Sequence, residues 1–587
     1  MIINATKKAK SMHARRNPNL SVTATAYAQL SPSVTSASFL SPTAASRRSL
    51  LSPSGPLSPS LPSLIPRHGK KQPSSGKSRS IQRVLAGIIC SLIALYLIIH
   101  HLFTPRPQPT GDVDSDYEMV GAGALPDVPT AVVVQDARGN ARWTVSIPPK
   151  ADFPLRPDQY QEICHQSMEL SKQLQQEARM GPIMKRMLSY YAKDQSYLDV
   201  QEAVEQGLLP ASQHEGRPHG FVDDVDIAAA KNAPINGLAV CDRSLTYVME
   251  TQDAGFGSTL LRMWMSYGLA MKEKRAFFVD DTRWPYGRFS TYFTPPPSPG
   301  CLPPPTSHMV PCPHSARHIV VSGATVRQTF GHAFTEEFED ARKMRVQRQH
   351  RIFGLLRTGY EALFKLRSDD ASYVTNRAET LYAPVAQDGG INVGMHVRHG
   401  DKHPYEYQYQ KDYIPLDRYI DTAREQSKKK AALIVASDDP SVYESPEFTT
   451  FNPPANRAQD RIVLATKRAL EAAQGKKNPW IDEVTGWEGG FYRDIFFSLG
   501  QPVGNANDVD SLDNNEKLPE SALRLRELVG RAYLMDLAVL AQADRVVCTV
   551  SSIGCRILAV MFGWDRAIIK GEWVNVDGQF EWKGIVW

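Results

Sequence analysis

The chain has 587 residues, of which 42% are hydrophobic and 22% are charged, a composition typical of globular proteins with room for more than one domain. A peptide hormone and a disulfide-rich mini-domain are excluded. The net charge of +5 is unevenly distributed: residues 1–83 carry 13 Lys and Arg and no Asp or Glu, which leaves 54 basic against 62 acidic residues, a net charge of −8, in the rest. The basic charge therefore belongs to an N-terminal tail and gives no support for binding of nucleic acid.

Residues 84–103 predict one membrane-spanning helix. They contain no Asp, Glu, Lys or Arg, and about twenty apolar residues are needed to cross a hydrocarbon core of about 30 Å. A buried helix of a soluble protein and a cleaved signal peptide are the alternatives, but the long basic region before the segment does not suit a signal peptide. Acidic residues follow the segment, at Asp112, Asp114, Asp116 and Glu118. The positive-inside rule therefore predicts a single-pass type II protein with a lumenal C-terminal part, which we expect in the Golgi membrane.

The regions on either side of this segment differ in composition and hydrophobic period. Residues 1–83 are rich in Ser, Pro and Ala and predict a disordered basic cytosolic tail. Residues 104–155 show no sustained period and predict a stem linker. In residues 156–215, Leu, Met and Tyr recur at spacings of three and four, which predicts a helical stem region that could also form a homodimer.

Beyond Gly237, apolar runs of strand length alternate with helix-length segments, a pattern that predicts parallel sheets with crossover helices. Strands are expected to begin at Ala276, His318, Ile391, Ala431 and Arg545, and an amphipathic helix from Ser521 leads into the last of them. Polar residues follow these strands, at the edge where open α/β sheets bind ligands. The sequence therefore predicts a mixed α/β fold with two lobes, at residues 216–390 and 391–587.

The densest group of chemically competent side chains lies in residues 394–406, GMHVRHGDKHPYE, where a buried strand runs into a turn. This segment offers His396, Arg398, His399, Asp401, Lys402, His403 and Glu406. Transfer of a sugar from a nucleotide needs a fixed cation for the departing diphosphate and a carboxylate that takes the proton of the acceptor hydroxyl. Arginine suits the first task because its planar guanidinium matches phosphate oxygens and stays charged. The alternative for this segment alone is a solvated turn with a structural ion pair.

Five segments together resemble one family. HVRHGDKHPYE resembles the His-Val-Arg-Arg-Thr-Asp-Lys-x-x-x-Glu signature of the α1,6-fucosyltransferases, the family 23 glycosyltransferases. Four further segments are similar to family segments in the same order: GFGSTLLRMWMSYGLA from Gly255, WPYGRFSTYF from Trp284, VASDDPS from Val435 and LAQADRVVCTVSSIGCR from Leu540. The resemblance covers about residues 237–560.

The resemblance implies roles for individual residues. Arg398 corresponds to the arginine that grips the donor pyrophosphate, Glu406 to the catalytic base and Lys402 to the lysine that partners this carboxylate. Asp536 would bind guanine, because its two oxygens can accept from the N1 and N2 donors of the base, and this favours a GDP-sugar over a UDP-sugar. The implied donor-binding residues are His396, Arg398, Gly255, Tyr286, Asp536, Ser552 and Tyr419. The implied supporting residues are Asp438, Asp439 and His399.

The same resemblance implies a GT-B-like pair of Rossmann-type lobes, with the acceptor side in residues 216–390 and the nucleotide-sugar-binding lobe in residues 391–587. The implied reaction is an inverting transfer of fucose from GDP-β-L-fucose to a glycan hydroxyl, with no metal ion or other cofactor. A metal-dependent transferase is the alternative suggested by Asp-x-Asp pairs. Two of these pairs lie in the stem, and none follows a convincing buried strand.

Departures from the family pattern leave other functions open. His399 stands where the family has a second arginine, so one donor-side cation is titratable. A membrane-anchored glycan- or nucleotide-binding protein without turnover, or a transferase of another GDP-sugar, is therefore an alternative. Residues 466–518 replace a shorter acceptor-side loop, so the acceptor glycan and the linkage do not follow from the sequence.

Six cysteines lie outside the predicted membrane helix, and six cysteines allow fifteen pairings. A metal site is the competing explanation, but the sequence has no Cys-x-x-Cys and no matching His spacing. The resemblance implies a Cys548–Cys555 disulfide, suits a Cys241–Cys301 pair, and leaves the pairing of Cys164 and Cys312 open.

Overall fold

The computed structural model describes residues 125–177, 190–211, 221–222, 238–250, 255–398, 414–426, 431–451, 455–464, 487–488, 491–492 and 520–584. All of these residues belong to one compact unit, Asp112–Trp587. The predicted tail, residues 1–83, and the predicted membrane helix, residues 84–103, lie outside the described residues. Within the described part, no helix is both long enough and apolar enough to cross a membrane.

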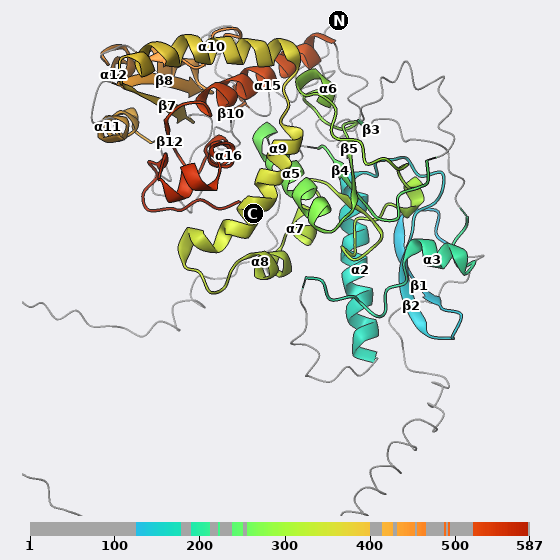
Figure 1. The fold of residues 1–587 in the computed structure, drawn as a ribbon. Coiled ribbons are helices and arrows are strands. Elements are labelled where there is room, and N and C mark those ends of the chain that lie inside the picture. The colour runs from blue at the N-terminus through green and yellow to red at the C-terminus, as the bar shows by residue number, and fades with distance from the viewer. Residues whose placement is uncertain are drawn as a thin grey trace, which may run out of the picture. The chain divides into compact units, whose positions relative to one another are not determined.

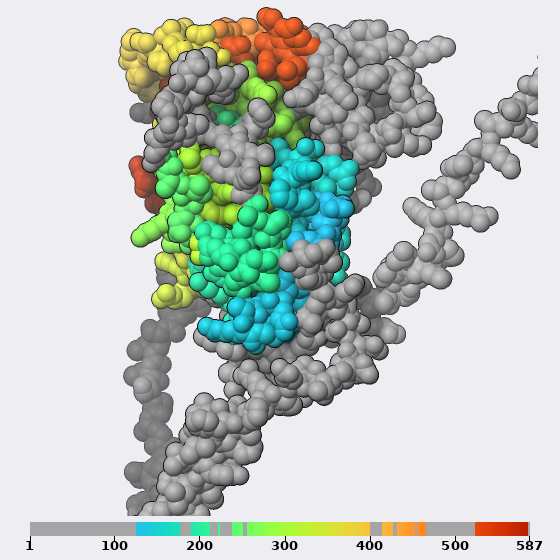
Figure 2. Space-filling view, turned by 90° about the vertical axis from the view of Figure 1, so that its right-hand side faces the viewer, coloured from blue at the N-terminus to red at the C-terminus, as the bar shows by residue number. Residues whose placement is uncertain are grey.

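A β-hairpin and two helices begin the described chain. They are β1 (Thr130–Gln135), β2 (Ala141–Ser146), α2 (Pro157–Glu177) and α3 (Val200–Glu205), and β1 pairs antiparallel with β2. The hairpin turn depends on Asp136, whose Oδ1 accepts hydrogen bonds from the backbone N–H groups of Arg138 and Asn140, both at 2.9 Å. Gly139 completes the turn at φ +79°, a conformation that glycine adopts without strain. Figure 2 shows parts of this segment, in blue to teal, at the surface.

The hairpin differs from the stem linker predicted for residues 104–155. Strand β1 buries Val132, Val133 and Val134 as a continuous apolar run, so the alternation typical of a half-buried strand is missing. Helix α2 packs against both strands. Trp143 of β2 is also buried, and its Nε1 donates to Asp194 at 2.8 Å. The segment is therefore part of the folded unit.

Four strands form the first of the two larger sheets. Their order is β3 (Phe221–Val222), β5 (Ala276–Asp280), β4 (Ser244–Val248) and β6 (His318–Val321), with β4, β5 and β6 parallel and β3 antiparallel at the edge. Helix α5 (Phe256–Lys272) contacts β4 and β5 and packs on α9 (His350–Leu363). The strands predicted at Ala276 and His318 are confirmed.

The strands of the second sheet are all parallel. Their order is β13 (Trp573–Asn575), β12 (Arg545–Cys548), β7 (Ile391–Val397), β8 (Ala431–Ser437) and β9 (Asn456–Arg457). The runs on β7, β8 and β12 are buried without alternation, because helices cover both faces of such a sheet. The strands predicted at Ile391, Ala431 and Arg545 are confirmed, and with them a mixed α/β fold with parallel sheets.

Helices pack on the second sheet. They are α10 (Ser368–Gln387), α15 (Glu520–Leu540), α11 (Leu416–Gln426) and α16 (Ile553–Phe562). In Figure 1, α10 and α15 run side by side along the sheet, while α11 lies across from them and contacts β7 and β12. The helix predicted from Ser521 is confirmed as α15, which begins one residue earlier.

The six cysteines of the described part form three disulfides, Cys164–Cys312, Cys241–Cys301 and Cys548–Cys555. Two of these pairs are those that the family resemblance indicated. The pairing left open joins α2 to the loop before β6. Cys548–Cys555 links the last residue of β12 to the first turn of α16, and so fixes the strand–turn–helix connection at one edge of the second sheet.

Helices α5 and α9 touch backbone to backbone because glycine stands at both contacts. A Cβ at Gly268 would lie 2.2 Å from the carbonyl oxygen of Leu355, and a Cβ at Gly359 would lie 2.2 Å from the carbonyl oxygen of Trp264. Interiors packed this densely do not admit an added carbon without moving a helix. The close approach of the two helices therefore requires glycine at both positions.

We expect Gly268→Ala to lower the free energy of unfolding by about 2 kcal/mol, because the added methyl group must push α5 away from α9. Gly354→Ala on α9 is the matched control, since no heavy atom lies within 4 Å of its Cβ position. The control should raise the free energy of unfolding by roughly 0.5–1 kcal/mol through the helix propensity of alanine. Urea unfolding followed by circular dichroism measures both variants, and equal effects would contradict the backbone contact.

Candidate functional site

The candidate site lies at the carboxyl edge of the second sheet. Strand β7 pairs with β8 on one side and β12 on the other, and Cys548 of β12 stands beside His396 of β7. The residues that follow these strands, Arg398, Asp438 and the 549–552 turn, therefore emerge next to one another. Open parallel sheets bind ligands at this edge.

Arg398 and Asp438 form an ion pair across the ends of β7 and β8. Arg398 Nη1 and Asp438 Oδ2 are 3.0 Å apart, and the side chains are 25% and 12% exposed. Water screens a partly buried pair less than one at the surface, so the attraction is stronger here. Asp438 thus holds the guanidinium at the sheet edge while part of it stays open to solvent.

The neighbouring Asp439 stabilises a turn and is not part of the ion pair with Arg398. It caps the 3-10 helix η6 (Pro440–Glu444), and its Oδ1 accepts from the backbone N–H of Ser441 at 2.9 Å and from the Ser441 hydroxyl at 2.6 Å. The two residues of the acidic pair that the family resemblance indicated therefore have different contacts. Asp438 contacts the cation of the candidate site, and Asp439 shapes the turn that follows it.

Tyr419 supports Arg398 from α11. Its side chain is 1% exposed, and its hydroxyl accepts a hydrogen bond from the backbone N–H of Arg398. Burial and then the negative charge of Asp438 raise the pKa of this phenol, so that it stays neutral. Tyr419 therefore fixes the backbone at the point where β7 ends.

His396 is uncharged and packs on the first turn of α16. A Cβ at Gly554 would lie 2.6 Å from His396 Nε2, so the ring requires glycine at that position. Burial and then the positive charge of Arg398 lower the pKa of His396 to about 4. A neutral imidazole can exchange a hydrogen bond with a ligand without competing with Arg398 for an anion.

The turn after β12 presents the N-terminus of α16. Ser552 is the N-cap and is 6% exposed, and its backbone N–H donates to the Thr549 carbonyl at 3.0 Å. Arg556 is buried in the first turn of the helix, and its Nε donates to the Val550 carbonyl at 2.8 Å. The N–H groups and the dipole at a helix N-terminus attract phosphate groups. This turn can therefore receive an anion at the same edge as Arg398.

The first turn of α5 reaches the same neighbourhood. Gly255 is the N-cap of α5, and a Cβ at Gly257 would lie 2.5 Å from the Tyr533 hydroxyl and 3.0 Å from Ile553 Cγ2. Tyr533 belongs to α15, and Ile553 is the first residue of α16. Gly257 thus lets the first turn of α5 approach both helices at their contact with Tyr533 and Ile553.

Tyr286 is packed in the core beside the first turn of α5. It is 0% exposed and belongs to an aromatic cluster with Phe256, Trp284 and Tyr292. The ring centroids of Tyr286 and Phe256 are 4.9 Å apart, and the Tyr292 hydroxyl donates to the Tyr286 carbonyl at 2.6 Å. Tyr286 contributes to core packing here, and its contact with a donor stays a prediction.

Asp536 is buried on α15, where it is 7% exposed. Its Oδ1 accepts from the backbone N–H of Gln459 at 3.3 Å. Burial raises the pKa of Asp536 well above its usual value, and the hydrogen bonds of Gln459 and the charge of Arg457 oppose this rise. A carboxyl group in such a place stays ionised only as far as its neighbours compensate for the lost water.

The residues that the structure brings together at the edge are His396, Arg398, Tyr419, Asp438 and Ser552. Glu406, Lys402 and His399 lie outside the described residues, so the base, its partner and the replaced arginine stay predictions. Within the described part, no three or more His, Cys, Asp or Glu side chains gather in a way that could hold a metal ion.

Buried acidic side chains at the carboxyl edge of the first sheet were not predicted from the sequence. Glu250 follows β4 and is 4% exposed, and its Oε1 accepts from the backbone N–H of Ala324 at 2.8 Å. Asp280 ends β5 and is 0% exposed. Burial raises the pKa of both carboxyl groups, that of Asp280 to about 7, and the charge of Arg283 opposes the rise. The signal in the sequence is an acidic residue at the end of each apolar run.

We expect Asp280 to make the protein less stable as the pH rises from about 4 to about 8. The pKa of Asp280 is about 7 in the folded protein, above the usual value of 3.8. Between these two pH values the folded state holds a proton that the unfolded state has lost, so folding loses stability as the pH rises from 3.8 to about 7. About three pH units correspond to about 4 kcal/mol. Asp280→Asn should remove this part of the pH dependence of urea unfolding. Asp242→Asn is the control, because the Asp242 side chain is 87% exposed, and it should keep the pH dependence of the parent protein. If the stability of Asp280→Asn changed with pH as much as that of the parent, Asp280 would not be the group responsible.

No family model and no curated protein matches the chain. Among solved structures, the chain is similar to the NodZ α1,6-fucosyltransferase soaked with GDP-fucose, with 14% identity and a TM-score of 0.28 over 54% of this chain and 92% of that chain. Fucosyltransferase NodZ from Bradyrhizobium gives 13% identity and a TM-score of 0.28, over 54% of this chain and 92% of that one. A variant of FUT1 from Arabidopsis thaliana in complex with GDP gives 11% identity and a TM-score of 0.28, over 57% of this chain and 72% of that one. At these identities and scores, the likeness assigns neither a family nor an activity to this chain.

Proposed function

We propose that this chain is a GT-B-like inverting glycosyltransferase that moves fucose from GDP-β-L-fucose to a glycan hydroxyl without a metal ion. The observation that carries the proposal is the Arg398–Asp438 pair at the carboxyl edge of a parallel sheet, with neutral His396 and the N-terminus of α16 at the same edge. The five segments that resemble the α1,6-fucosyltransferases support it, because four of them meet in this region.

In this proposal, Arg398 binds the donor pyrophosphate and the α16 N-terminus at Ser552 receives its oxygens. Negative charge grows on the diphosphate as its bond to the sugar breaks. A guanidinium paired with Asp438, on a backbone that Tyr419 holds, stabilises that charge with little reorganisation, which is the basis of electrostatic catalysis. Arginine and helix dipole together take the part that a divalent ion plays in metal-dependent transferases.

In the acceptor step, we assign roles to two residues that the family resemblance indicates, Glu406 and Lys402. Glu406 takes the proton of the acceptor hydroxyl, the hydroxyl oxygen attacks C1 of the fucose, and GDP leaves with the electron pair of the broken C1–O bond. A single displacement inverts the configuration at C1. Lys402 holds Glu406 in its ionised form.

The proposal includes the setting of the reaction. We infer a single-pass type II protein of the Golgi membrane, anchored by residues 84–103, with the acceptor glycan bound on the side of residues 216–390. The basic tail and the acidic residues after the apolar segment support this orientation. The acceptor glycan is a substrate, and no nucleic acid takes part.

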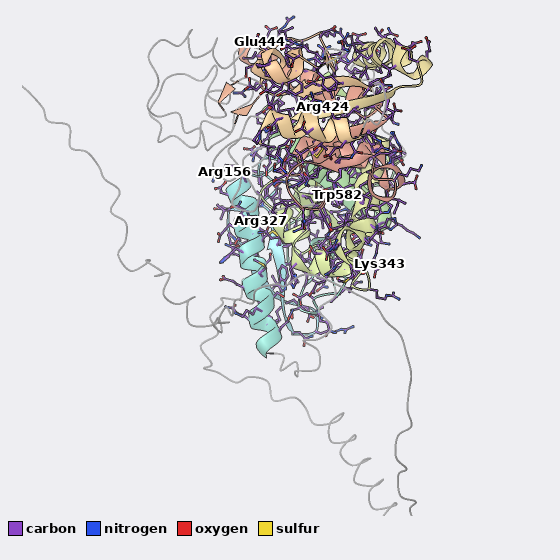
Figure 3. All side chains as sticks on the ribbon, turned by 90° about the vertical axis from the view of Figure 1, so that its left-hand side faces the viewer. Arg156, Arg327, Lys343, Arg424, Glu444 and Trp582 are labelled. Atoms are coloured by element: carbon purple, nitrogen blue, oxygen red, sulfur yellow. A yellow bond between two sulfur atoms is a disulfide. The ribbon has the colours of Figure 1, made fainter. Side chains whose placement is uncertain are left out.

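We expect the full-length chain in detergent to bind GDP but not UDP when EDTA is present, as measured by calorimetry. Arg398→Ala should weaken GDP binding by about 100-fold, because a charge-assisted contact to phosphate is lost, and should abolish fucose transfer with an unchanged circular dichroism spectrum. Arg424→Ala, on α11, is the control variant. Figure 3 labels this residue. Binding that needs added Mn²⁺ would favour the metal-dependent alternative, and an active Arg398→Ala would refute the mechanism.

Glu406→Gln should keep the affinity for GDP but lower kcat for transfer by at least about 100-fold, because an amide cannot take the acceptor proton. The exposed Glu444, also labelled in Figure 3, provides the matched control Glu444→Gln. Loss of both GDP binding and transfer in Glu406→Gln would indicate a structural role. A parent protein that binds GDP but transfers no fucose to any glycan would favour the binding protein without turnover.

A further inference from the structure

A pocket of about 230 Å³ lies between α9 and the end of α16. Its lining comes from the first half of α9 and from the segment that joins α16 to the short helix η9 (Asp565–Ile569). Figure 1 shows α9 beside α16. Ser552 caps the other end of α16, and a helix of 10 residues is about 15 Å long. The pocket is therefore separate from the candidate site.

Trp564 forms a fixed aromatic wall of this pocket. The indole is half-buried, and its ring centroid lies 4.7 Å from that of His350 and 5.1 Å from that of Phe353, both in edge-on arrangements. Phe353 is buried and also packs on Trp582, at 4.8 Å between centroids. Because the core holds the indole in this way, a ligand does not have to order it on binding.

Two guanidinium groups line the pocket, and backbone carbonyls hold both of them. Arg357 Nη1 donates to the carbonyls of Val560 and Met561 at 2.8 and 2.7 Å. Arg566 Nη2 donates to the Ala543 carbonyl at 2.9 Å. Among the described contacts of the two residues, none uses Nη2 of Arg357 or Nη1 of Arg566. These nitrogens can therefore donate to oxygen atoms of a ligand.

The fixed charges of the lining are balanced by neighbouring charges. Arg357 Nε lies 2.7 Å from Glu361 Oε1, and Arg566 Nε lies 2.5 Å from Glu572 Oε2. Asp565, the acidic residue of the lining, has a lysine ammonium at 2.8 Å. An anionic ligand would meet the two glutamates beside its cations, so their attraction for it is partly cancelled. The pocket therefore favours a neutral ligand.

The chemistry of the lining indicates which neutral ligand fits. A wholly apolar molecule would remove water from the guanidinium groups and from His350 without replacing the lost hydrogen bonds. A pyranose unit has hydroxyls that donate and accept, and a C–H face that can lie against an indole. Pockets for drug-sized molecules measure about 300 to 1,000 Å³. The smaller pocket here suits a single ring.

We propose that the pocket between α9 and α16 binds one neutral pyranose unit of a glycan, as a second sugar site of this protein. The inference goes beyond the proposed function, which concerns the nucleotide-sugar and the acceptor hydroxyl at the carboxyl edge of the second sheet. Binding in the pocket needs no donor, so it can be measured without fucose transfer.

The test measures sugar binding to the full-length protein by saturation-transfer NMR, in a detergent without a sugar headgroup. The probes are the methyl glycosides of glucose, galactose, mannose and N-acetylglucosamine, and the anionic methyl glucuronide. We expect at least one neutral glycoside to bind with a dissociation constant of about 1 mM, and more tightly than methyl glucuronide. Gly354→Leu should weaken this binding by at least about tenfold, because Gly354 lines the pocket and no heavy atom lies within 4 Å of its Cβ position. Leucine suits an exposed helix position, so the variant should fold.

Ser372→Leu is the matched control, because Ser372 is exposed on α10 and lies outside the pocket lining. It should bind the sugar as the parent does. Equal binding to the parent and to Gly354→Leu would overturn the inference, as would preferred binding of methyl glucuronide or no binding of any neutral glycoside. Calorimetry with GDP should give the same affinity for all three proteins, so these outcomes leave the proposed function standing. A parent that binds a neutral glycoside in the pocket but binds no GDP would overturn the proposed function alone.

Discussion

The parallel pairing of β7 with β8 and β12 is the constraint on which the candidate site depends. The three strands are far apart in the chain, yet their carboxyl ends must meet at one edge because they run in the same direction. Each strand then delivers a different kind of group: a guanidinium after β7, a carboxylate after β8 and a helix N-terminus after β12. One strand alone could not place a guanidinium, a carboxylate and a helix N-terminus together, because its neighbouring side chains point to opposite faces of the sheet.

Burial tunes the groups that the sheet brings together. Arg398 keeps part of its surface in water, so it can exchange Asp438 for a ligand, whereas His396 and Tyr419 are enclosed and uncharged. Among the described residues at this edge, Arg398 therefore presents a partly exposed positive charge beside two buried, neutral rings. Asp536 is enclosed as well, and burial raises its pKa well above the usual value, against the hydrogen bonds of Gln459 and the charge of Arg457.

The sequence predicted the elements that rest on uninterrupted apolar runs, but not the contacts between elements. The strands at Ala276 and Ile391 follow from composition alone, because a parallel sheet buries both faces. The hairpin at residues 130–146 was missed because its valines do not alternate with polar residues. The contact between Gln459 and Asp536 could not be read from the sequence, since the two residues are 77 positions apart. Lys402 and Glu406 follow from the motif alone.

The Cys164–Cys312 disulfide connects α2 to the loop before β6, across a sequence separation of 148 residues. In the chain-entropy description, closing a loop of that length stabilises the folded state by about 5 kcal/mol. The bridge also gives the chain a second covalent route. The bridge joins Cys164 directly to Cys312 and so bypasses the intervening chain, which includes β4, α5 and β5. A single cut of the backbone between residues 164 and 312 would likewise leave both pieces joined until a reductant opens the bridge. The hairpin and α2 are thereby anchored to the fold by a bond, in addition to the packing that covers them.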